Sequence, residues 1–135
     1  MTVFESIVHI NRPVAELYNF LSDLNNHQQL MPAQVQDWRS TANEASFSIQ
    51  NMAKLSLGVQ ERVENAEITI VPVEEPPFKM MFKWQLAQEN SYTSVQYTIA
   101  AELNMMMKML ASGPLQKLAD HQTQALAEIF GREPA

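Results

Sequence analysis

The chain has 135 residues, 46% of them hydrophobic and 18% charged, which is typical of one globular domain and too apolar for a disordered segment. Its formal net charge of −6 and sequence pI of about 4.9 argue against nucleic-acid partners, because those require clustered Lys and Arg. No apolar run approaches the roughly 20 residues that a membrane helix needs, so we expect one water-soluble domain over residues 1–135 without a membrane span.

The N-terminal quarter of the chain predicts one strand followed by two short helices. Apolar and polar residues alternate over residues 3–10, which is typical of a half-buried strand. Pro13 suits the first turn of a helix, and apolar residues recur at helical spacing over residues 14–24. A second short helix or turn over residues 25–32 should end at its proline.

The middle of the chain predicts a series of strands, each with one apolar face. Period-two alternation covers residues 46–49, 54–63, 67–70, 78–86 and 94–103. The last two segments are separated only by a short polar turn around Glu89. Short connections between successive strands favour an antiparallel meander over a parallel sheet.

From Asn104 onward the apolar period becomes helical. Gly113 and Pro114 are expected to break or kink this segment before a long helix over residues 115–130. One stripe of that helix contains Leu115, Leu118, Ala119, Ala125, Leu126 and Ile129, with Gln122 in its middle. An α+β helix-grip fold follows, in which a curved antiparallel sheet of about six or seven strands wraps round the long C-terminal helix. An apolar pocket is expected between the two.

Two polar residues interrupt apolar faces and are therefore candidates for function. Glu61 shares parity with the apolar residues of its segment, so an inward carboxylate could orient a ligand or act as a general base. Alternatively, a bulge at Gly58 turns Glu61 outward, or an internal Arg pairs with it. Gln122 could bind a ligand carbonyl or hydroxyl, or it could satisfy a backbone group at the pocket rim.

Aromatic side chains on inward faces complete the candidate site. Tyr97 and Trp84 could donate to a ligand, although large aromatics at strand parity are more often part of the core. The hydroxyl of Ser6, on the inward face of the first strand, is expected to be satisfied locally. The expected ligand-binding residues are Phe47, Leu57, Val59, Glu61, Phe82, Trp84, Tyr97, Ile99, Leu118, Gln122 and Leu126.

Several kinds of chemistry find no motif in the sequence. Cysteine is absent, so neither a disulfide nor a thiolate zinc site is expected, and a cytoplasmic location is the default. His9, His27 and His121 fall in different segments and lack the spacing that places two metal ligands on one helical face. There is no glycine-rich phosphate loop and no nucleophile motif. We therefore expect no metal and no cofactor.

The methionines Met105, Met106, Met107 and Met109 cluster ahead of Gly113. Flexible thioethers suit either ordinary core filling or an adaptable apolar surface for a partner, and a methionine-rich hinge could also gate the pocket.

The order of elements resembles the START and Bet v 1-like (SRPBCC) superfamily, and in particular its polyketide cyclase/dehydrase-like group. The resemblance is carried by ESIVHINRPVAELYNFLSDL and NNHQQLMP over residues 5–32, QERVENAEI over residues 60–68, the step Pro77–Phe78, and ELNMMMKMLASGPLQKLAD over residues 102–120. Met105 departs from the pattern, which usually has a proline there. The resemblance implies a cavity for sterols, lipids, polyketides or quinones.

The sequence supports three hypotheses about function. The leading hypothesis is a binding protein for a small hydrophobic molecule in a cavity between the sheet and the C-terminal helix. A cyclase or dehydratase would use Glu61 as its base, with Gln122 or Tyr97 as orienting donors. An accessory module that binds a partner would expose an apolar patch such as the methionine cluster, and a homodimer stays open.

Overall fold

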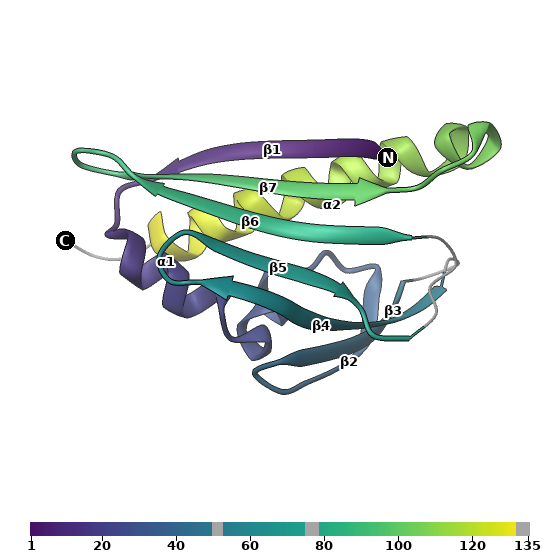
Figure 1. Ribbon diagram of the computed structural model, residues 1–135, viewed down its shortest axis with the longest axis horizontal. Helices are drawn as coiled ribbons and strands as arrows, with labels where there is room; N and C mark the ends of the chain where they lie inside the picture. Colours follow the sequence, from purple (N-terminus) through teal and green to yellow (C-terminus); the bar gives the residue numbers. More distant parts are fainter. Residues whose placement is uncertain (50–52, 75–78, 132–135) are drawn as a thin grey trace.

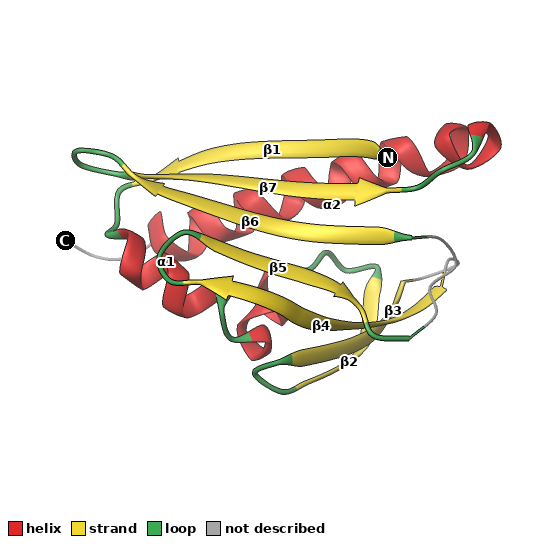
Figure 2. Cartoon of the chain, in the orientation of Figure 1, coloured by secondary structure: helices red, strands yellow, loops and turns green. Residues whose placement is uncertain are grey.

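The computed structural model describes residues 1–49, 53–74 and 79–131. The described strands form one antiparallel sheet of seven strands in the order β1-β7-β6-β5-β4-β3-β2. The helical elements cover one face of this curved sheet, and α2 runs along β1 and β7 (Figures 1 and 2). The elements are β1 (Thr2–Ile10), α1 (Val14–Leu21), the 3₁₀ helix η1 (Leu24–Leu30), β2 (Val35–Ser40), β3 (Glu44–Ile49), β4 (Ala53–Val63), β5 (Glu67–Pro72), β6 (Met80–Gln88), β7 (Thr93–Ala101) and α2 (Met105–Gly131).

The predicted α+β helix-grip fold is confirmed, with one strand that the sequence did not predict. That strand, β2, pairs with β3, and its register shifts between Gln36 and Arg39. Asp37, which lies in this interval, has a φ of 57°, in the left-handed region. The irregularity places the interior-facing residues Val35 and Trp38 three positions apart instead of two. Strict alternation is thereby lost, so the pattern of a strand is hidden.

A second irregularity, in β4, corrects the expected orientation of Glu61. Val59 pairs with Ile70, but the next pair joins Glu61 to Thr69, so β4 carries one extra residue at this point. An extra residue turns every later side chain to the opposite face. The inward orientation of Glu61 is therefore wrong, and its side chain is exposed to solvent. The alternative of a bulge that turns Glu61 outward is confirmed, although the extra residue lies between Val59 and Glu61 and not at Gly58.

The same bulge gives Arg62 a structural role. Arg62 pairs with the fully buried Ile68, and residues directly opposite each other share a face of the sheet. Its guanidinium donates to the carbonyl of Ser22 at 3.1 and 2.7 Å and to that of Ala42 at 3.0 Å. Arg62 thus ties the end of α1 and the β2–β3 turn to the sheet.

Helix α2 begins at Met105, where the sequence predicts the helical period to start, and it is one continuous helix instead of a separate long helix over residues 115–130. The side chain of Asn104 accepts a hydrogen bond of 2.8 Å from the backbone N–H of Met107, which is the usual role of an N-cap residue. The helix then continues through Gly113 and Pro114, so these residues do not break it. Proline removes one backbone hydrogen bond, and packing of the residues that follow offsets this loss. No described helix is long and apolar enough to cross a membrane.

The buried side of α2 packs against the sheet and holds two polar residues as well as apolar ones. Gln122 and Thr123 are both buried. The hydroxyls of Thr123 and Ser6 lie 2.7 Å apart, which joins α2 to β1. The expectation of a local partner for Ser6 is therefore wrong, since its partner is far away in sequence. The remaining buried residues of this side are Ala111, Leu115, Ala119 and Leu126.

Candidate functional site

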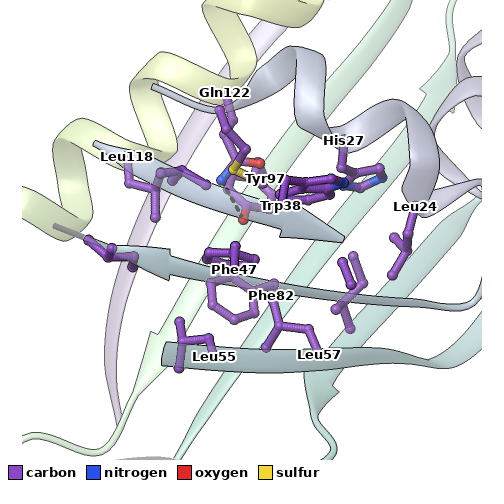
Figure 3. A pocket seen from close by; sticks show the side chains of 15 residues that line it. Leu24, His27, Trp38, Phe47, Leu55, Leu57, Phe82, Tyr97, Leu118 and Gln122 are labelled. Atoms are coloured by element: carbon purple, nitrogen blue, oxygen red, sulfur yellow. Dashed lines mark hydrogen bonds between the residues drawn. The ribbon is translucent and has the colours of Figure 1, made fainter. Parts of the chain in front are cut away.

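An internal cavity lies where the curved sheet faces η1 and α2 (Figure 3). Its volume is about 30 Å³, which is room for about one water molecule. Side chains therefore fill almost all of the space in which the sequence predicted a pocket. The cavity is lined by Leu24, His27, Met31, Val35, Trp38, Ala45, Phe47, Ile49, Leu55, Leu57, Ile70, Phe82, Tyr97, Leu118 and Gln122.

The structure brings part of the predicted site together at this cavity. Of the expected ligand-binding residues, the lining includes Phe47, Leu57, Phe82, Tyr97, Leu118 and Gln122. Trp84, Ile99 and Leu126 are buried but do not line it, and Val59 is half-buried elsewhere on β4. Glu61 lies on the outside of the sheet, beyond the bulge.

The polar centre of the cavity is a hydrogen bond between α2 and β7. The side-chain amide of Gln122 donates to the Tyr97 hydroxyl at 3.1 Å, and both residues are buried (Figure 3). Burial raises the pKa of Tyr97 well above its usual value, while the bond from Gln122 opposes this rise. The phenol therefore stays protonated at neutral pH, so it can donate a hydrogen bond but cannot serve as a base.

Behind Tyr97 lies the fully buried indole of Trp84. The two rings stack with centroids 4.1 Å apart and an interplanar angle of 26°. The indole nitrogen has no hydrogen-bond partner within the part of the chain that the structure describes. Trp84 therefore supports the site by packing, as the core interpretation of this residue predicts.

His27 is a cavity residue that sequence reasoning did not single out. Its Nε2–H donates to the Leu21 carbonyl at 2.7 Å, and its ring meets Trp84 edge-on. Burial lowers the pKa of His27 to about 4, against the opposing effects of that hydrogen bond and of Asp23. A signal exists in the sequence, because the buried residues Leu24, His27 and Leu30 recur every third position, as one side of a 3₁₀ helix requires.

Trp38, on the unpredicted strand β2, was missed for the same reason as the strand itself. Its ring stacks on Phe47 with centroids 5.2 Å apart, and its indole N–H donates to the Ser40 hydroxyl at 2.9 Å. The half-buried Trp38 thus closes one side of the cavity.

A larger hollow opens to solvent beside the cavity. This groove, of about 630 Å³, is lined by Pro32, Ala33, Gln34, Val35, Ile49, Pro114, Leu115, Lys117, Leu118 and His121. Val35, Ile49 and Leu118 line both the groove and the internal cavity. These three side chains therefore form the wall between the interior and the groove. Nowhere in residues 1–49, 53–74 and 79–131 do three or more His, Asp or Glu side chains gather as a metal site would require.

Comparison with known proteins shows which solved structures share this architecture. No family model matches the chain, and a search of curated protein sequences finds no significant match. Among solved structures, a START superfamily protein from Mycobacterium smegmatis matches with a TM-score of 0.72 at 15% identity, covering 96% of this chain and 97% of that one. The chain has the START-like helix-grip fold. The resemblance seen in the sequence is thus confirmed at the level of the fold.

Two further structures share the START-like fold. The KanY protein matches with a TM-score of 0.78 at 13% identity, over 96% of this chain and 97% of that one. The Aha1 dimer from Colwellia psychrerythraea matches with a TM-score of 0.71, also at 13% identity, over 96% of each chain. Identities this low establish the common fold and carry no residue roles.

Proposed function

We propose that this protein binds a small hydrophobic ligand whose apolar body lies in the groove between α2 and the segment 32–35. The observation that carries the proposal is the shared wall of Val35, Ile49 and Leu118 between the groove and the apolar interior. The groove volume of about 630 Å³ falls within the range of about 300–1,000 Å³ that is usual for small-molecule sites. Lipids, sterols, polyketides and quinones are the ligand classes that the sequence resemblance implies.

The ligand would lie in the external groove and not in the internal cavity. A cavity of about 30 Å³ has no room for such a molecule. A ligand seated in the groove reaches the interior only if the side chains of the shared wall change rotamers, and all three of these side chains are half-buried. Tyr97 and Gln122 would then be the first polar groups that it meets.

Filling the groove tests the proposal. We expect Leu118→Trp to weaken binding of the neutral fluorophore N-phenyl-1-naphthylamine by at least about tenfold. The indole would occupy the space of the dye, and a ligand that loses apolar contacts in a pocket loses affinity by this factor or more. Fluorescence titration measures the affinity. Gln124→Trp is the matched control, since Gln124 is exposed on the same helix and lies outside the groove. Equal affinity of Leu118→Trp and the wild type would contradict the proposal, as would a wild type that binds no dye.

The cyclase or dehydratase alternative finds little support. Its base was to be Glu61, which is exposed on the outer side of the bulge. None of the described residues that line the internal cavity is Asp or Glu. Tyr97 is held protonated by burial, so it supplies no base either. Binding without chemistry is the function that this geometry favours.

A second candidate function rests on the first turns of α2. Met105, Met106, Met109 and Leu110 are exposed there, with exposed fractions of 81%, 71%, 82% and 73%. These turns extend past the end of β1, away from the sheet (Figure 1). Contiguous exposed apolar side chains mark interaction surfaces, and flexible methionines suit them well. We propose that this methionine surface pairs with a second copy of the chain. The similarly folded Aha1 protein, which is a dimer, supports this proposal.

If the methionine surface mediates self-association, the fraction of dimer measured by sedimentation velocity should increase with protein concentration. Met106→Glu is expected to shift the chain toward monomer, because the new carboxylate would be desolvated at the interface. Gln124→Glu adds the same charge to an exposed site at the other end of α2 and should leave the dimer unchanged. A wild type that stays monomeric at all concentrations would exclude this candidate.

A further inference from the structure

We propose that the groove selects an amphipathic anion, a molecule with an apolar body and one carboxylate, sulfonate or phosphate group, and that Lys117 and His121 hold the anionic group. This inference rests on the proposed function and specifies its ligand. The described lining of the groove contains Lys117 and His121 as its only ionisable side chains, and no carboxylate. The remaining lining is mainly apolar, apart from the amide of Gln34.

The two basic side chains are placed to act on one group. Lys117 and His121 lie four residues apart on α2, so they are neighbours on one face of the helix. Leu118, part of the apolar wall, lies between them in sequence and lines the same groove. An ammonium offers three donors and an imidazole adds a ring N–H, which suits the oxygens of an anionic group. The apolar body of the ligand would then rest on Leu118 and its neighbours.

The groove differs in charge from the chain as a whole. The protein has 15 Asp and Glu against 9 Lys and Arg, so an anion is repelled on average. Within the described residues, neither Lys117 nor His121 forms an ion pair. The nearby Asp120 accepts a hydrogen bond from Gln116 at 3.2 Å and does not line the groove. Lys117 and His121 are therefore available to a ligand.

The anion is a free molecule, not the headgroup of a membrane surface. Attraction to an anionic bilayer depends on clusters of about four to eight Lys and Arg. The groove offers one lysine, in a chain whose net charge is −6. A concave site of about 630 Å³ instead suits a single small molecule.

Two dyes that differ in one anionic group test the inference. N-phenyl-1-naphthylamine is neutral, and 1-anilinonaphthalene-8-sulfonate adds a sulfonate to the same ring system. We expect the wild type to bind the sulfonate dye more tightly than the neutral dye. Lys117→Gln should lower the affinity for the sulfonate dye by about fivefold, which is the upper range for an exposed ion pair. The affinity of Lys117→Gln for the neutral dye should fall by less than its affinity for the sulfonate dye, because the neutral dye has no anionic group for the ammonium to hold. Added salt should reduce the preference for the sulfonate dye.

Lys108→Gln removes a charge from the same helix at an exposed position outside the groove and should change neither affinity. If the wild type binds both dyes equally, or if Lys117→Gln and Lys108→Gln have the same effect, the anion inference is overturned while binding in the groove stands. If neither dye binds, the proposed function itself fails. Sedimentation with vesicles of anionic phospholipid that depends on Lys117 would overturn the assignment of a free molecule.

Discussion

Replacing Trp84 with alanine is expected to lower the free energy of unfolding by about 3–5 kcal/mol, the usual cost of removing a large buried aromatic side chain. Trp84 is fully buried on the interior strand β6, stacked on Tyr97 and in edge contact with His27. Its loss would leave a cavity beneath the polar centre of the site. Urea denaturation followed by circular dichroism measures the change. Since whole domains are stable by only about 5–15 kcal/mol, this is a large effect.

Trp84→Phe is the control for the indole nitrogen. That nitrogen has no hydrogen-bond partner among the described residues, so phenylalanine removes volume without removing a hydrogen bond. We expect a smaller loss, less than half of that for alanine. If phenylalanine is as damaging as alanine, the indole N–H contributes an interaction and the packing explanation of Trp84 is wrong.

Acidification is expected to destabilise the protein through His27. The folded-state pKa of His27 is about 4, below its ordinary value of 6.5, because burial disfavours the charged imidazolium. Between these two values the unfolded chain binds more protons than the folded chain, so stability falls as pH falls through this window. This stability is fully present above pH 6.5, and about 3 kcal/mol of it is lost once the pH has fallen to the folded-state pKa.

His27→Gln isolates this contribution, because a glutamine amide retains a donor for the Leu21 carbonyl but does not titrate. Free energies of unfolding are measured for both proteins at pH values across the window. The carboxylates titrate in both chains, so the difference between the two curves reports His27. The stability of the variant should depend less on pH below 6.5. Parallel curves for the two proteins would show that burial of His27 does not drive the acid sensitivity.

The regular strands could be predicted because their evidence is local. On β6 the buried residues Met80, Phe82, Trp84 and Leu86 alternate with more exposed ones, and β7 repeats the pattern around Tyr97. A period of two places alternate residues on one face whatever the rest of the chain does. The placement of Gln122 on the buried side of α2 follows in the same way from the helical period.

Such patterns do not locate the two irregularities, although a bulge that turns Glu61 outward was one of the alternatives for β4. An extra residue at the β4 bulge reverses every side chain that follows, which placed Glu61 outside and Arg62 above Ile68. The shift around Asp37 concealed β2 and with it Trp38. Bulges are specified by the pairing with neighbouring strands, and a single strand read alone does not contain that information.

Short-range periodicity was sufficient to predict the order of the strands and helices and which residues face the interior over their regular parts. Tertiary structure alone decided whether the interior is empty. The volumes of side chains from η1, α2 and six strands, β2 to β7, reduce the cavity to about 30 Å³. It also decided that Val35, Ile49 and Leu118, distant in sequence, form one wall, and that Lys117 and His121 border the groove beside it. Packing between distant segments sets such volumes, so only the folded chain reveals them.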